Sequence, residues 1–243
     1  VRRVPIDGGF TCPTRDGALS TSGCLYCDGR GASSAPRGLS IRGQLLRGME
    51  AARRRYGAEK FIAYFQAFTG TYASPGELAR RYAEGTDHPD VVSLAIATRP
   101  DCAPEAVLDA VAAFAARMET WIEYGLQSAH DETLRCLMRG HTAAAFADAA
   151  RRTAARGIGV CAHVIIGLPG ETGEMVRGTA RFLASLPVSG VKIHLLHVLR
   201  GSPLEALHRS GALPLLSRGD YVRLVCDVLE ILPAGAVVAS ASE

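Results

Sequence analysis

The sequence predicts an α/β fold in which parallel strands alternate with helices along a single domain of 243 residues. Short apolar runs rich in β-branched and aromatic residues alternate with longer amphipathic stretches, the order typical of β/α units. No repeat, low-complexity tract or linker divides the chain. Six successive units of this kind predict a barrel of parallel strands, open or closed.

The expected elements follow from this alternation. Strands are expected at residues 4–6, 61–68, 91–98, 120–127, 159–166 and 191–199. Helices are expected between them at residues 41–56, 75–84, 104–118, 142–156 and 172–186. Ser74, Pro75 and Glu77 form a capping box with proline at the first helical position, which marks one helix start. A further helix at 215–232 and a short strand at 236–239 complete a domain spanning 1–243, for which we expect short missing extensions at both ends.

Residue parity sorts the side chains of each strand between the helix-covered outside and the lumen of the barrel. The apolar set should face outward, as Ile122, Tyr124 and Leu126 do in the fourth strand. The residues then expected to face inward are Arg99, Glu123, Gly125, Gln127, His163, Gly167, Lys192 and His194. A purely structural barrel would hold branched apolar residues there. The pattern therefore predicts a polar ligand in the lumen.

Composition narrows the class of protein. The sequence has no run of about 18 apolar residues and no opening signal segment, so we expect a cytoplasmic protein without a membrane partner. Seven cysteines, an odd number, favour thiolate chemistry over a disulfide framework. The net charge is +3, and the basic residues are almost all arginine. Arginine suits phosphate binding, but this bias also follows from GC-rich codons. The charge permits an RNA partner without requiring one.

Three cysteines follow the first expected strand in a glycine-rich loop, at the carboxyl end of the barrel where active sites lie. Cys12, Cys24 and Cys27 can hold a 4Fe-4S cluster and leave one iron without a protein ligand. Zinc is the alternative metal for this site, although the loop has no histidine and no fourth cysteine to complete its ligands. Three ordinary buried cysteines are the remaining alternative. The other cysteines, which lack paired spacing, read as packing residues or as a second cluster: Cys102, Cys136, Cys161 and Cys226.

Five motifs and the cysteine spacing together resemble a known family. They are IDGGFTCP at 6–13, YFQAFT at 64–69, TRPD at 98–101, EYGLQS at 123–128, IGLPGE at 166–171 and the Cys-x11-Cys-x2-Cys spacing. Across essentially the whole chain, the sequence resembles a bacterial radical S-adenosylmethionine (SAM) subfamily related to the catalytic subunit of Elongator. The resemblance implies an α/β partial (β/α)6 radical SAM barrel. It also implies that SAM binds the open iron and is cleaved reductively to a 5′-deoxyadenosyl radical, with an electron donor such as flavodoxin or ferredoxin.

The same resemblance implies cofactor-binding roles for particular residues. Tyr26 is expected near the adenine, and Gln66 and Thr69 near the methionine amino group. Glu123 and Gln127 match polar positions near the ribose and carboxylate of SAM, which agrees with their inward parity. The turn containing Gly167 and Pro169 is expected to let the backbone approach the adenine.

The remaining inward polar residues are candidates for substrate binding or proton transfer. His163, Lys192 and His194 are the candidate catalytic residues, and Lys192 would need an anionic partner, such as a substrate, if buried. Arg139 and His141 could join them or could be solvated in a loop. The resemblance implies modification of a wobble uridine of tRNA. A small molecule or a protein side chain as substrate, or a non-enzymatic iron–sulfur protein, are the alternatives.

Overall fold

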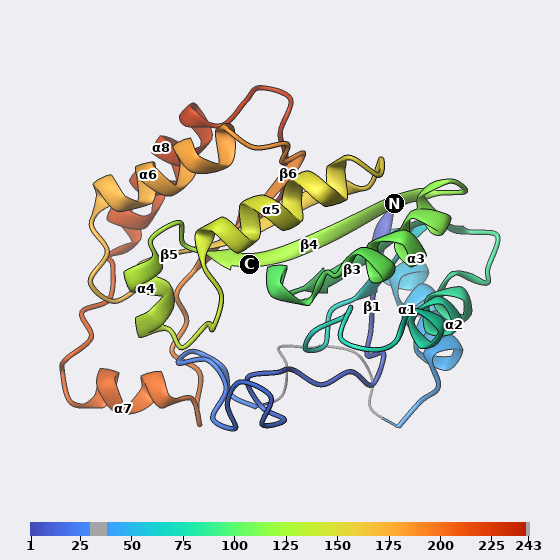
Figure 1. Ribbon diagram of the computed structural model, residues 1–243, viewed down its shortest axis with the longest axis horizontal. Coiled ribbons are helices and arrows are strands. Elements are labelled where there is room, and N and C mark those ends of the chain that lie inside the picture. The colour runs from blue at the N-terminus through green and yellow to red at the C-terminus, as the bar shows by residue number, and fades with distance from the viewer. Residues whose placement is uncertain (30–37, 242–243) are drawn as a thin grey trace.

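The computed structural model describes residues 1–29 and 38–241. Its centre is one sheet of seven parallel strands in the order β1-β2-β3-β4-β5-β6-β7, curled into a half-barrel (Figure 1). The strands are β1 (Arg2–Ile6), β2 (Phe61–Phe65), β3 (Val91–Thr98), β4 (Glu119–Gln127), β5 (Gly159–Ile166), β6 (Gly190–Leu195) and β7 (Val237–Ala241). Each strand pairs in parallel with the next strand in the sequence, so the carboxyl ends of all the strands lie along one rim of the half-barrel.

Helices connect the strands and cover the outer face of the sheet (Figure 1). They are α1 (Ile41–Tyr56), α2 (Pro75–Thr86), α3 (Glu105–Ala115), α4 (Asp131–Cys136), α5 (Ala143–Ala154), α6 (Gly173–Ala184), α7 (Pro203–Arg209) and α8 (Arg218–Ile231), with a 3-10 turn at Pro100–Cys102. Ser74 caps α2 by accepting a hydrogen bond from the backbone of Glu77, so the helix starts where predicted, while the Glu77 carboxylate pairs with Arg81. None of the helices within residues 1–29 and 38–241 is long and apolar enough to cross a membrane.

The hydrophobic core lies between the sheet and this helical layer. Ile122, Tyr124 and Leu126 are buried in it, and the Tyr124 hydroxyl hydrogen-bonds the Thr153 hydroxyl of α5 at 2.7 Å. The ring of Tyr124 meets that of Phe146 edge-on, with centroids 6.1 Å apart. The alternate residues of β4 are left for the inner face, so the predicted parity is confirmed.

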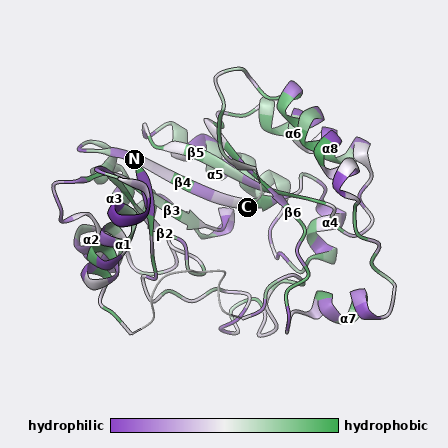
Figure 2. Cartoon of the chain, turned by 180° about the vertical axis from the view of Figure 1, so that it is seen from behind, coloured by the Kyte–Doolittle hydropathy of each residue, from purple (hydrophilic) through white to green (hydrophobic). Residues whose placement is uncertain are grey.

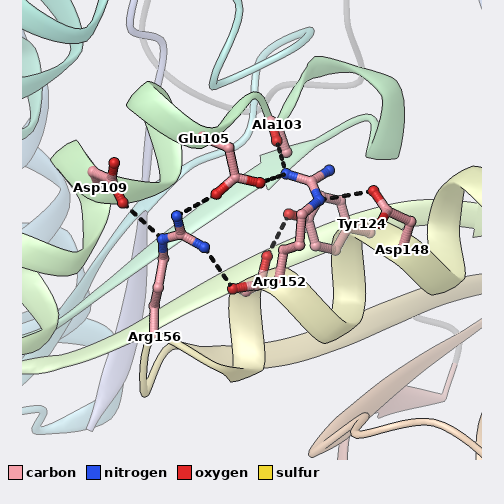
Figure 3. A network of polar contacts seen from close by, with 8 residues as sticks. Ala103, Glu105, Asp109, Tyr124, Asp148, Arg152 and Arg156 are labelled. Carbon is pink, nitrogen blue, oxygen red and sulfur yellow. Dashed lines mark hydrogen bonds and ion pairs between the residues drawn. The ribbon is translucent and has the colours of Figure 1, made fainter.

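An arginine-rich network ties α3 to α5 outside the core (Figure 3). Arg152 donates to the carbonyl of Ala103 at 2.7 Å and to Glu105 at 3.1 Å. Arg156 donates to Asp109 at 2.8 Å and also pairs with Glu105. These acidic side chains are more than half exposed, so each ion pair contributes little free energy. The network therefore joins the two helices at the surface and adds little to their stability.

The observed boundaries depart from the expected ones mainly at the carboxyl ends of strands. The expected strands 61–68 and 191–199 end at Phe65 and Leu195. The loop after Phe65 borders the inner cavity, and the loop after Leu195 lines a second cavity. The short helices α4 and α7 were not expected from the sequence, because their apolar residues are too few to show a helical period. Both views of the chain show α7 apart from the helical layer (Figure 2).

Candidate active site

A cavity of about 730 Å³ occupies the inner face of the half-barrel. Strands at both edges contribute to it, since Arg3 of β1 and Ala239 of β7 line its wall. It brings together most residues singled out from the sequence: Cys12, Cys24, Tyr26, Cys27, Gln66, Thr69, Arg99, Glu123, Gln127, Arg139, His163, Lys192 and His194. The polar residues that parity assigned to the inner face therefore line this cavity, and a polar ligand in the lumen stays a prediction.

Each of the three loop cysteines has a polar neighbour that can stabilise a thiolate. The Cys12 sulfur lies 3.1 Å from the Thr14 hydroxyl. Arg139 donates to the Cys24 sulfur at 3.3 Å, and Arg15 donates to the Cys27 sulfur at 3.4 Å. Cationic donors favour the thiolate over the thiol, and the thiolate is the form that binds metal.

The surroundings of Cys12 differ from those of Cys102 and Cys161. Burial raises the pKa of Cys12, but the hydrogen bond of its sulfur with Thr14, together with the nearby Thr69 and Arg99, outweighs burial and brings the pKa below its usual value. Burial raises the pKa of Cys102 and of Cys161 to about 12, so both remain thiols at neutral pH. The assignment of Cys12, Cys24 and Cys27 as metal ligands stays a prediction.

The spacing of the three sulfurs also bears on the choice of metal. Among the described residues, the ligand atoms that lie within 4.8 Å of one another belong to Glu123, Cys161 and His163, and not to the three loop cysteines. A single tetrahedral zinc with Zn–S bonds of about 2.3 Å would hold its sulfurs roughly 3.8 Å apart. The sulfurs of Cys12, Cys24 and Cys27 are therefore not arranged around a single zinc ion in this structure.

The Glu123, Cys161 and His163 group is a poor metal site in its present form. Arg3 and Lys192 already pair with the Glu123 carboxylate, and their two positive charges oppose a further cation. Cys161 stays protonated, as its raised pKa shows. The group is better understood as part of an internal ion-pair cluster.

Arg139 and His141 are buried beside the cysteine loop and are not solvated, which corrects the open reading of the sequence. Arg139 donates to the Gly125 carbonyl at 2.7 Å as well as to the Cys24 sulfur, and its Nε donates to His141 at 3.2 Å. Burial and the neighbouring guanidinium groups of Arg139 and Arg99 lower the pKa of His141 to about 4. Nothing in the local sequence distinguishes this loop from an exposed one, because Arg139 is buried by contacts with Gly125 and Cys24, which lie elsewhere in the sequence.

Two polar side chains crowd position 125, where glycine leaves room for them. A β-carbon there would lie 2.8 Å from the Gln127 amide and 3.0 Å from an Arg139 guanidinium nitrogen. Gln127 itself has a φ of 73°, a conformation that non-glycine residues rarely adopt, and it borders a register shift in β4. Strain of this kind is concentrated at functional sites, and here it points the end of β4 at the cavity.

Arg99 supplies an unpartnered donor next to the cysteines. Its guanidinium donates to Asp101 at 2.8 and 3.0 Å and to the Arg139 carbonyl. The remaining nitrogen, Nη1, is buried and has no hydrogen-bond partner within residues 1–29 and 38–241. A buried orphan donor is costly unless a ligand satisfies it, and an anionic group such as the SAM carboxylate would do so.

Glu123 is the centre of an ion-pair cluster deeper in the cavity. Its carboxylate pairs with Arg3, lies 2.6 Å from the Lys192 ammonium and lies 2.9 Å from the His163 ring. Burial opposes ionisation, but His163, Lys192 and Arg3 hold the pKa of Glu123 well below its usual value. The Lys192 ammonium also lies 3.0 Å from the Tyr64 hydroxyl.

This cluster revises the expectation for Lys192. The anionic partner is Glu123 of the chain itself, so Lys192 does not require a substrate anion to be buried. Glu123 lines the cavity as predicted, yet three neighbouring side chains already bond its carboxylate oxygens. A contact of Glu123 with SAM stays a prediction.

Gly167 and Pro169 do not line the main cavity, and their approach to the adenine stays a prediction. The chain turns away after β5 ends at Ile166, with Gly167 at a φ of 91°. Gly167 instead lines a second cavity of about 580 Å³ beside the loop after β6 and α7. A β-carbon at Gly167 would lie 3.2 Å from the Leu216 side chain, so close packing explains this glycine.

Comparison with known proteins defines the class. The sequence matches the Radical SAM superfamily over residues 20–183 and the Radical_SAM C-terminal domain over residues 188–239. The chain belongs to the Radical SAM superfamily, a family of enzymes. Within it, the chain is 40% identical over 240 residues to the uncharacterized protein YtqA of Bacillus subtilis, covering 98% of this chain and 74% of YtqA.

Two more distant likenesses point to one group of proteins. The tRNA uridine(34) acetyltransferase of Dehalococcoides mccartyi is 27% identical over 172 residues, which cover 70% of this chain and 37% of that protein. The solved structure of the archaeal Methanocaldococcus infernus Elp3 superposes with a TM-score of 0.76 and 17% identity. That match covers 100% of this chain and 56% of the Elp3 chain, so the chain spans little more than half of that structure.

Proposed function

We propose that Cys12, Cys24 and Cys27 hold a 4Fe-4S cluster and that SAM binds its open iron inside the 730 Å³ cavity. When bound, the cluster supplies the electron that cleaves SAM to a 5′-deoxyadenosyl radical. The single observation that carries the proposal is the convergence of the three cysteines on one cavity wall, each with a polar group against its sulfur. Family membership supports the same cofactors.

The residues around the cluster have separate tasks in this proposal. Arg139 and Arg15 stabilise the thiolates through hydrogen bonds to sulfur. The free Nη1 of Arg99 would receive the SAM carboxylate. The rest of SAM is expected to contact four residues that line the cavity: Tyr26, Gln66, Thr69 and Gln127. These groups bind and orient the cofactor, and the cofactor carries the chemistry.

We further propose that the substrate is a wobble uridine of tRNA. Support comes from two of the more distant relatives, which are named tRNA uridine(34) acetyltransferases. The arginines and lysine of the cavity wall add positive charge, which favours a nucleic acid over a cationic substrate. In this proposal the enzyme works in the cytoplasm and takes its electron from flavodoxin or ferredoxin.

The test of this substrate is chemical. Mass spectrometry of tRNA nucleosides from a strain lacking the gene should show a changed wobble-uridine profile. Complementation with the Cys226→Ala variant should restore the profile, because Cys226 is exposed and lies outside the cavity, whereas Cys27→Ala should not restore it. An unchanged profile in the deletion strain would remove the tRNA assignment while leaving the cofactor site in place.

A further inference from the structure

The inner cluster contains a continuous chain of contacts from a buried carboxylate to the cavity wall. The Glu123 carboxylate lies 2.9 Å from Nε2 of His163, and Nδ1 of His163 lies 3.3 Å from Nε2 of His194. The two imidazole rings have centroids 5.2 Å apart. Glu123 is fully buried, whereas His194 is only partly buried and lines the cavity.

This chain of contacts dictates where the protons sit. Glu123 is ionised, because its pKa is held low by His163, Lys192 and Arg3. A carboxylate can only accept, so His163 must carry its proton on Nε2. Burial lowers the pKa of His163, and a neutral imidazole protonated on Nε2 accepts at Nδ1. His194 must therefore donate from its own Nε2.

His194 is left with a lone pair on Nδ1. Burial and the neighbouring His163 and Lys192 lower the pKa of His194 to about 4, so the ring is neutral at physiological pH. No hydrogen bond to its Nδ1 from any described residue is present. The cavity wall thus offers one acceptor of fixed tautomer in surroundings that otherwise consist mainly of donors.

A donor stands beside this acceptor. Lys192 uses two of its three N–H groups on Glu123 and on the Tyr64 hydroxyl, and a third remains. Arg3 and Lys192 together carry one more positive charge than Glu123 carries negative charge. A neutral imidazole acceptor flanked by an ammonium donor matches a ligand edge in which an N–H lies next to a carbonyl oxygen. The imide edge of a uracil ring is such an edge, and the corresponding edge of cytosine is not, because its ring nitrogen is an acceptor.

We propose that Nδ1 of His194 accepts the imide N–H of a uracil ring, with Lys192 donating to the adjacent carbonyl, and that this pair selects uracil over cytosine. Glu123 and His163 are positioning residues that hold the His194 tautomer. The proposal rests on the proposed uridine substrate and names the residues that would recognise it. No covalent step is involved, since the contact is a hydrogen bond.

The test compares three anticodon stem–loop RNAs that carry uridine, 3-methyluridine or cytidine at the wobble position. Fluorescence anisotropy with the oxidised, cluster-loaded protein should show uridine bound about tenfold or more tighter than either alternative, since a donor or acceptor left unpaired costs that much. His194→Leu should bind all three RNAs within about twofold of one another, because the acceptor is gone. His208→Leu is the matched control, since His208 lines the second cavity and should leave the preference intact.

A second measurement reads the tautomers directly. Nitrogen-15 spectra of the histidine side chains should show both His163 and His194 protonated at Nε2, and His163→Leu should release His194 into a mixture of tautomers. Equal affinity for uridine and 3-methyluridine, binding to none of the RNAs, or a proton on Nδ1 of His194 would overturn the proposal. If the deletion strain lacks a wobble-uridine modification but no uridine preference is found, only this assignment fails. If the preference is present and the tRNA profile is unchanged, the proposed function fails instead.

Discussion

Replacing Glu123 by glutamine would test the inner ion-pair cluster most severely. The Glu123 side chain is 0% exposed and its partner Lys192 is 8% exposed, so neither water nor counterions can replace the lost charge. Removing one partner of a buried ion pair costs about 3–5 kcal/mol of the free energy of unfolding. Arg3 adds less to this cost, because its side chain is 31% exposed and can turn toward solvent.

The pH dependence of Glu123→Gln follows from Lys192. Burial already lowers the pKa of Lys192, and Glu123 opposes that effect by raising it. Without Glu123 the folded-state pKa falls further below the unfolded value of about 10.4, so the unfolded chain binds more protons between the two values. Stability of the variant should therefore rise with pH across this window, and its deficit should shrink toward pH 9.

Urea unfolding of the wild type, Glu123→Gln, Lys192→Met and the double variant at pH 7 and pH 9 provides the assay. The double variant should recover most of the stability lost in Glu123→Gln, because it leaves no buried ammonium unpaired. A loss below about 1 kcal/mol in Glu123→Gln, or a double variant whose losses simply add, would refute the reasoning.

Three other outcomes are expected. Anaerobically reconstituted Cys27→Ala should lose the iron and brown colour of the cluster, whereas Cys226→Ala should keep them; stoichiometric zinc in the wild type would contradict the site. Arg139→Gln should lower the reduction potential of the cluster, because the variant loses a buried cationic donor to the Cys24 sulfur. The potential is measured by a redox titration followed by electron paramagnetic resonance, and an unchanged value would count against that contact. Since the pKa of His194 is about 4 in the folded protein, its contribution to stability is present above the unfolded value of about 6.5 and is lost as pH falls through 4. Wild-type unfolding at pH 7 and pH 4.5 should show the loss, and His194→Leu should show a smaller one.

Local patterns were sufficient to predict the sheet and most of its inner face. Parity alone placed Glu123, His163 and Lys192 on the cavity side, because each strand is covered by helices on one face only. The Cys-x11-Cys-x2-Cys loop was evident for a similar reason, since its residues are close in sequence. The interior of each strand was predicted well because apolar periodicity is strongest there.

Contacts between distant segments could not be predicted in the same way. Arg139 lies 115 positions from Cys24, and Lys192 lies 69 positions from Glu123, so no local pattern pairs them. The close packing of Gly167 against Leu216 could not be predicted either, because these residues are far apart in the sequence. The sequence therefore predicted which polar residues line the cavity, and only the structure showed which of them form hydrogen bonds and ion pairs with one another.

The most direct test of the central claim is the product formed from SAM. Reconstituted protein incubated anaerobically with dithionite and SAM should release 5′-deoxyadenosine, and Cys12→Ala, which lacks one of the three cysteines that line the cavity, should release none. Absence of 5′-deoxyadenosine from wild-type protein that carries a complete cluster and binds SAM would contradict the account.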